Sequence, residues 1–191
     1  MLDNDRILSC AEKAAIVAYT VLDLDCSYSV ALINEPDIGQ DARLDAQNNV
    51  IELNLALLEP FSTERIPSPV PFDQLTEEEQ CLDEDYRHLM KICAVVFHEM
   101  RHLYQKQCVK AYCINQAVGG KEAPQRESDK KCAMWMNEMR TPAEGQDIED
   151  DAEDFAYYLT CRFPLQLPML RTNRRIGGFK RKYDKVEIPA L

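Results

Sequence analysis

The sequence predicts an α+β fold in which a small antiparallel sheet packs against two helices from the second half of the chain. Apolar residues recur at three- and four-residue steps over residues 3–22, which is the period of an amphipathic helix. Residues 28–33 and 50–55 show the alternation that is typical of strands with one buried face. Residues 77–108 and 147–162 show the helical period again. Helices therefore flank a group of strands.

The predicted sheet contains up to three strands. Residues 28–33 form the first and residues 42–46 a weaker candidate. Residues 47–49, Gln-Asn-Asn, predict a turn because Asn tolerates a positive φ. The strand at 50–55 places three apolar residues on one face and polar residues, including Asn54, on the other. We expect an antiparallel sheet with one buried face.

Prolines separate this sheet from the next helix. Residues 59–75 hold four of them and predict a long loop, which could border a cleft or act as a spacer. Thr76, followed three residues later by Glu79, fits a capping box that starts a helix. One helix or two could cover 77–108.

The last third of the chain predicts two more helices. Residues 114–127 contain Gly-Gly and Pro and are expected to be irregular. Ser128 could cap a short helix with a buried apolar stripe. Acidic residues crowd the start of 147–162, where the helix dipole favours them, and Pro164 ends that helix.

Composition indicates a single soluble domain. The chain has 191 residues and a net charge of −11, which disfavours a general nucleic-acid binder. The start of the chain lacks the apolar core of a signal peptide, and no run is long enough to span a membrane. We expect a cytoplasmic protein whose eight cysteines are reduced and mostly buried; a disulfide or a second metal site is the alternative.

The charge divides the chain into an acidic domain, residues 1–170, and a basic tail, residues 171–191. The tail holds seven Lys or Arg against two acidic residues. It is expected to fold back onto the acidic body, although it could instead bind an acidic partner or nucleic acid.

Residues 95–104 contain the motif His-Glu-x-x-His within the predicted helix. Residues four apart on an α-helix lie about 40° apart around its axis. His98 and His102 therefore project from one face, and two such imidazoles can bind one tetrahedral Zn²⁺. Glu99 could take a proton from a water at the metal. A solvated helix face is the alternative, but the chain has only three histidines and the residues before His98 are apolar.

A catalytic zinc needs a third protein ligand and a position open to water. His88 lies ten residues before His98 and is expected to face elsewhere. Carboxylates of residues 147–162 are the remaining candidates. We favour Glu149, because the small Ala152 would let its helix approach the first one closely.

The neighbouring acids receive other roles. Glu153, one turn after Glu149, is expected to accept a hydrogen bond from the second ring nitrogen of a ligand histidine. Glu153 and Asp151 are also alternative ligands. Asp150 and Asp154 are expected to be solvated.

These motifs resemble the gluzincin group of zinc metallopeptidases, in which a His-Glu-x-x-His helix is followed by a helix bearing Glu-x-x-Ala and an acidic or amide residue. The continuation Phe155-Ala156 is similar to the small ImmA/IrrE-like metallopeptidases of prokaryotes and mobile elements. The resemblance covers roughly 28–162, with specific motifs at 98–102 and 149–156. It implies a minimal zincin-like fold and Zn²⁺-dependent hydrolysis of peptide bonds in a protein or peptide substrate.

Two comparisons refine the resemblance. The metzincin pattern fails, because Gln105 and Cys108 stand where it needs Gly and His. Peptidases of the resembled group usually have uncharged residues where this chain has Arg101, which bears on activity rather than on metal binding. An extended peptide could pair with a sheet edge. A donor to the substrate oxyanion is also expected, with four candidates: Tyr104, Tyr112, Tyr157 and Tyr158.

Two other functions fit the same residues. The chain could be a non-catalytic, zinc-stabilised protein-interaction domain in which the metal only holds two helices together. It could also be a metal-free helical scaffold.

Overall fold

The computed structural model describes residues 2–62, 75–141, 146–163, 169 and 172–189. It is an α+β fold of helices and a small mixed sheet. The elements are α1 (Asn4–Leu22), β1 (Ser29–Ile33), the 3-10 turn η1 (Pro36–Ile38), β2 (Ala42–Asp45), β3 (Val50–Asn54), α2 (Glu77–Val118), α3 (Asp129–Arg140), α4 (Asp147–Arg162) and α5 (Arg174–Tyr183).

The prediction of an antiparallel sheet was wrong. The strand order is β1-β3-β2, with β1 parallel to β3 and β2 antiparallel to it. The chain reverses direction twice between β1 and β3, so these two strands run the same way. Asn54 fixes the first reversal, because its side-chain amide donates to the carbonyls of Glu35 (2.8 Å) and Gln40 (3.1 Å). Asn54 is therefore 1% exposed rather than on a solvated face.

The predicted turn between β2 and β3 is confirmed. Asn49 has a φ of 55°, in the left-handed region. The amide of Asn48 donates to the carboxylate of Asp45 at 2.7 Å. Short polar side chains thus build this hairpin, as their sequence indicated.

A single helix, α2, replaces the one or two helices expected over 77–108. It begins at the predicted capping box, where the Thr76 hydroxyl accepts from the Glu79 N–H and the Glu79 carboxylate accepts from the Thr76 N–H. It continues to Val118, so the expectation of an irregular segment from residue 114 was wrong for residues 114–118. Gly119, with a φ of 65°, ends it. Its 42 residues correspond to a length of about 63 Å.

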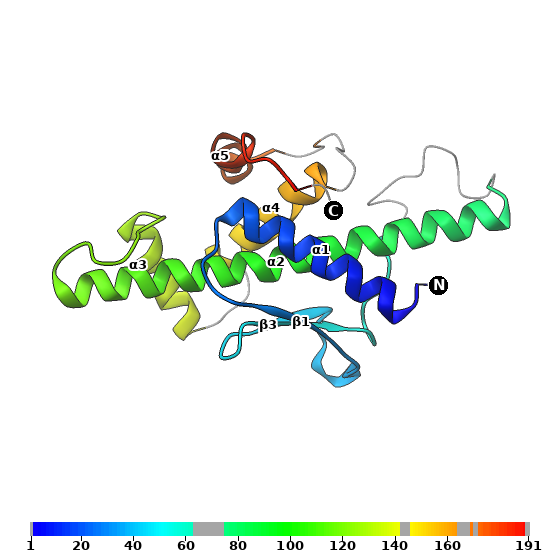
Figure 1. The fold of residues 1–191 in the computed structure, drawn as a ribbon, viewed down its shortest axis with the longest axis horizontal. Coiled ribbons are helices and arrows are strands. Elements are labelled where there is room, and N and C mark those ends of the chain that lie inside the picture. Colours follow the sequence, from blue (N-terminus) through cyan, green and yellow to red (C-terminus); the bar gives the residue numbers. More distant parts are fainter. Residues whose placement is uncertain (1, 63–74, 142–145, 164–168, 170–171, 190–191) are drawn as a thin grey trace.

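The other elements pack around α2, which crosses the whole molecule (Figure 1). The sheet lies on one side of α2 and α5 on the opposite side, with α1 and α4 also against α2. Small residues on α1, including Ala11, Ala14 and Ala18, are fully buried in the core. These small side chains let α1 pack closely against α2, and the sheet and α4 contact the same helix.

The basic tail folds back onto the acidic body, as expected. Within it, α5 buries Ile176, Phe179 and Tyr183. The guanidinium of Arg175 pairs with carboxylates of α4, at 3.5 Å from Asp150 and 3.6 Å from Asp154. Arg175 therefore lies beside the acidic first turns of α4, while Lys182 of the same helix pairs with Glu127 at 2.9 Å.

Two further expectations concern the membrane and the loops. Among the described residues, no helix combines the length and apolar character that crossing a bilayer requires. The predicted proline loop falls largely on residues 63–74, which lie outside the described residues.

Candidate metal centre

His98 and His102 lie one turn apart on α2, on the side that faces α4. Their rings are edge-to-face, and the two Nε2 atoms are 2.9 Å apart. Their side chains are 26% and 18% exposed, so both are partly covered but reachable. The i, i+4 spacing on a regular helix is sufficient to produce this arrangement.

Glu149 brings a carboxylate to the same point from the first turn of α4. Its Oε2 lies 3.4 Å from the Nε2 of His98 and 3.4 Å from the Nε2 of His102. Zinc ligands at about 2.0–2.1 Å in a tetrahedral arrangement lie about 3.3–3.4 Å from one another. The two nitrogen–oxygen distances match this spacing, and the nitrogen–nitrogen distance of 2.9 Å is shorter by about 0.4 Å, so a small rotation of the imidazoles would accommodate one small divalent cation. Among the described residues, these three form a group able to hold a metal ion.

The electrostatics of the cluster keep Glu149 ionised. The neighbouring His102 and His98 side chains hold the pKa of the Glu149 carboxyl well below its usual range, although partial burial opposes them. The Glu149 side chain is 51% exposed, so the cluster opens to solvent on this side. A carboxylate that is charged and solvent-accessible suits a metal ligand beside an exchangeable water.

Glu99 lies next to the cluster but is buried, with 8% exposure. Burial raises the pKa of its carboxyl, while His102 and His98 act in the opposite direction. The backbone N–H of Leu44, on the edge strand β2, also lowers this pKa. A carboxylate with a raised pKa is a better proton acceptor than an ordinary surface glutamate.

Gln105, rather than Glu153, is the hydrogen-bond partner of the outer nitrogen of His102. The His102 Nδ1 lies 2.8 Å from the Gln105 Oε1. Glu153 is exposed on α4 and does not take this place at His102; the role expected for it toward a ligand histidine otherwise stays a prediction. No sequence pattern pointed to Gln105, because a glutamine three residues after a candidate ligand histidine belongs to no recognised motif.

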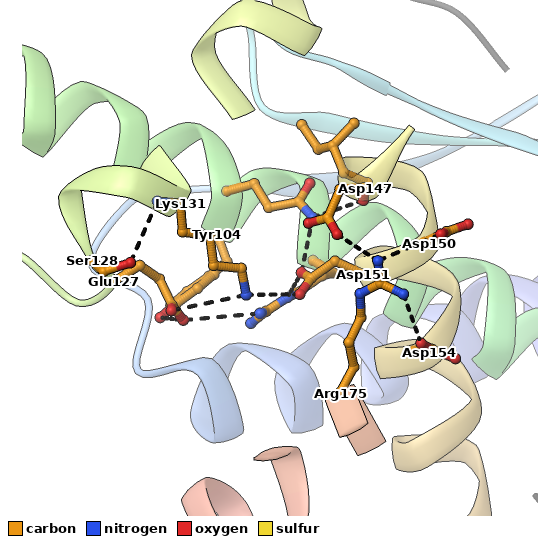
Figure 2. Close-up of polar contacts among 12 residues, drawn as sticks. Tyr104, Glu127, Ser128, Lys131, Asp147, Asp150, Asp151, Asp154 and Arg175 are labelled. Carbon is orange, nitrogen blue, oxygen red and sulfur yellow. Dashed lines mark hydrogen bonds and ion pairs between the residues drawn. The ribbon is translucent and has the colours of Figure 1, made fainter. Parts of the chain in front are cut away.

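Asp151, an alternative ligand in the sequence, has another role. It is fully buried and accepts hydrogen bonds from Arg101 (2.7 Å), Gln105 (3.0 Å) and Lys131 (2.9 Å). Burial raises its pKa, but Arg101 and Lys131 outweigh that effect and the pKa falls to about 2. Figure 2 shows Asp151 within this group of charged residues. Its carboxylate is committed to cations and amides away from the metal cluster.

Arg101 points away from the two histidines and into the core. Its guanidinium is stacked near the rings of Tyr104 (4.5 Å) and Phe179 (5.0 Å) and forms the ion pair with Asp151. It therefore adds no positive charge to the mouth of the cluster. The charged residue between Glu99 and His102 therefore does not face the open side of the cluster.

Asp154 was wrongly expected to be solvated. It is 6% exposed, accepts from the Asn173 amide at 2.8 Å and lies 3.6 Å from the Arg175 guanidinium. Asp150 is exposed as expected and lies 3.5 Å from Arg175. Both acids help to hold α5 against α4 (Figure 2).

Two of the four tyrosines considered as oxyanion donors are used elsewhere. The buried Tyr104 donates to Glu127 at 2.9 Å and accepts from Lys182 at 2.8 Å. Tyr158 donates to Asp184 at 2.9 Å. Tyr112 and Tyr157, both partly exposed, remain candidates.

The eight cysteines are free thiols, and four of them are buried. The Sγ atoms of Cys10 and Cys93 approach to 3.8 Å across the α1–α2 contact. The cysteines thus serve mainly as small packing residues, as expected.

Comparison with known proteins gives no assignment. No protein-family model matches the chain, and no curated protein or solved structure matches it significantly.

Proposed function

We propose that this protein is a zinc-dependent metallopeptidase that hydrolyses peptide bonds in a protein or peptide substrate. The observation that carries the proposal is the convergence of His98, His102 and Glu149 at mutual distances of 2.9–3.4 Å, with the buried Glu99 alongside. The mixed fold and the resemblance of residues 98–102 and 149–156 to small gluzincins support a zincin-like assignment.

The residues divide into ligands and a base. His98, His102 and Glu149 would hold the cation and leave one position on the solvent side. When bound, zinc supplies a Lewis acid that polarises a carbonyl and lowers the pKa of a coordinated water. Glu99 would accept a proton from the attacking water and pass it to the leaving amine. The backbone N–H of Leu44 would help to orient the Glu99 carboxylate for this transfer.

The Glu99→Gln variant tests the proposal. Zinc content is measured by elemental analysis, and cleavage of a mixture of unstructured peptides is followed by mass spectrometry. We expect Glu99→Gln to retain stoichiometric zinc and to lose at least about 10²-fold in cleavage rate. The control is Asp150→Asn, which removes an exposed acid beside Glu149 and should cleave at the wild-type rate. Wild-type protein that holds zinc and cleaves none of the peptides would contradict the proposal.

A zinc-stabilised interaction domain is the second candidate. The observation in its favour is that the three ligand side chains join α2 to α4, so a bound ion would also stabilise their packing. In that case Glu99→Gln would change neither zinc binding nor partner binding, and His98→Ala would lower the melting temperature. Elemental analysis of untagged protein also excludes or supports the metal-free scaffold.

A further inference from the structure

We propose that Gln105 is the positioning residue of the candidate metal centre. Its side-chain amide fixes the tautomer of His102 and ties that ring to the first turn of α4, which carries Glu149. The inference rests on the proposed metal site and concerns how the protein prepares it. Gln105 is completely buried, and its amide makes three hydrogen bonds.

The orientation of the Gln105 amide follows from its two partners on α4. Its Nε2 lies 2.9 Å from the carbonyl oxygen of Ile148 and 3.0 Å from the Oδ2 of Asp151. A carbonyl can only accept, and the Asp151 carboxylate is paired with Arg101 and also only accepts. The NH₂ group must therefore face α4, which leaves the Oε1 facing His102.

This orientation determines where the proton of His102 lies. The Gln105 Oε1 can only accept, so the Nδ1 of His102, at 2.8 Å, must donate to it. In the neutral ring the Nε2 then carries a lone pair, and this is the nitrogen that faces His98 and Glu149. In the metal-free protein the hydrogen bond between the two Nε2 atoms must use a proton on His98. The two histidines should therefore be opposite tautomers.

The same amide also sets the position of Glu149. Ile148 and Asp151 lie on either side of Glu149 in the sequence, and both accept from Gln105. One side chain on α2 is thus bonded to a ligand histidine on its own helix and to the turn that carries the third ligand. Substitution of such a partner typically weakens metal binding by about 10–100-fold.

Two variants separate the two roles of Gln105. Gln105→Met has a similar volume and removes all three hydrogen bonds. Gln105→Glu retains an acceptor for the His102 Nδ1–H but removes the donors to α4. Gln116→Met, on an exposed part of the same helix, is the control. For each protein we would measure the His102 tautomer by long-range ¹H–¹⁵N NMR without metal, above the imidazole pKa, and the zinc Kd by competition with a chromophoric chelator.

In wild-type protein we expect His102 protonated on Nδ1 and His98 on Nε2. Gln105→Met should give a mixture of His102 tautomers and a zinc Kd raised about 10–100-fold. Gln105→Glu should keep the wild-type His102 tautomer but bind zinc more weakly than wild type. A purely structural role of Gln105 would not separate the tautomer from the zinc affinity in this way. The control should match wild type in both measurements.

Two results would overturn the inference: a wild-type His102 protonated on Nε2, or a Gln105→Met protein that binds zinc as tightly as wild type. Both are independent of catalysis. Zinc-loaded wild-type protein without peptidase activity would remove the proposed function and leave the role of Gln105 standing.

Discussion

Arg101 and Asp151 form an ion pair of 2.7 Å in which each side chain is only 1% exposed. Arg101 immediately precedes the ligand candidate His102, and Asp151 lies two residues after Glu149. The pair therefore fixes α2 against α4 beside the place where the candidate ligands His98, His102 and Glu149 meet. Aromatic rings surround the guanidinium, so the pair is shielded from water and depends on both partners being present.

Asp151→Asn should destabilise the protein strongly. Removal of one partner leaves the Arg101 charge buried without its carboxylate, which costs about 3–5 kcal/mol of unfolding free energy. Urea unfolding with a metal chelator present would measure the change. Asp150→Asn removes a neighbouring exposed acid and should change stability by less than about 1 kcal/mol. Equal effects of the two substitutions would show that the buried pair has no special importance.

Zinc should raise the melting temperature through His98 and not through His88. A ligand that binds only the folded state at about 100 times its Kd adds about 2.7 kcal/mol. Thermal unfolding with zinc and with excess chelator would measure this difference in wild type. His98→Ala should abolish it, whereas His88→Ala should retain it, because His88 lies outside the cluster. Retention of the zinc effect in His98→Ala would contradict the assigned ligand set.

Glu127 should make stability sensitive to acid. Burial raises the pKa of its carboxyl, but Lys131 and Lys182 outweigh this effect, so the net pKa is lowered. A lowered pKa means that the contribution is complete above the unfolded-state value, about 4.3, and is lost as pH falls through the folded-state value.

The Glu127→Gln variant tests this dependence. The difference in unfolding free energy between wild type and Glu127→Gln should be constant from about pH 7 to 5.5 and shrink below about pH 4.3. Urea unfolding at several pH values would measure it. A difference that grows in acid would have the wrong sign for a lowered carboxyl pKa.

Thiol labelling should separate the cysteines by position. Burial raises the pKa of the Cys132 thiol to about 11, so little thiolate forms near pH 8 and the alkylating reagent also lacks access. Cys81 and Cys113 are exposed. With iodoacetamide and mass spectrometry we expect early labelling at these two residues, and at Cys132 only after denaturation. Early labelling of Cys132 would indicate that α3 separates from the core in the native state.

The helices were predictable because their ends carry local signals. Thr76 and Glu79 marked the start of α2, and the acidic turn before Ala152 marked α4. The end of α2 was missed, because residues 114–118 contain no helix-breaking residue and Gly119-Gly120 lie just beyond. The residues that end α2 are these two glycines, and they come after residues 114–118, which were expected to be irregular. Helix ends are in general located less well than helix centres.

The order of the strands could not be predicted in the same way. Alternation identified each strand, but the parallel pairing of β1 with β3 depends on long-range hydrogen bonds from Asn54 to the connection after β1. An asparagine at an alternating position is expected on the solvated face. The burial of Asn54 follows from its hydrogen bonds to Glu35 and Gln40, which only the three-dimensional structure shows.

The candidate metal centre also contains residues that could be predicted from local sequence and residues that could not. His98, His102 and Glu149 were predictable from spacing, because helical geometry places the first two and a second helix needs only one acid in reach. Gln105 and Asp151 were not, since their partners lie on another helix, over forty residues away in sequence.

The Leu44 contact has a consequence for how this protein can vary. The sheet approaches Glu99 with the main-chain N–H of Leu44, so this interaction does not depend on the side chain at position 44, which itself packs against the core. Only proline, which lacks that N–H, would break the link. Relatives of this protein should therefore avoid proline at position 44 of the edge strand and keep an apolar residue there.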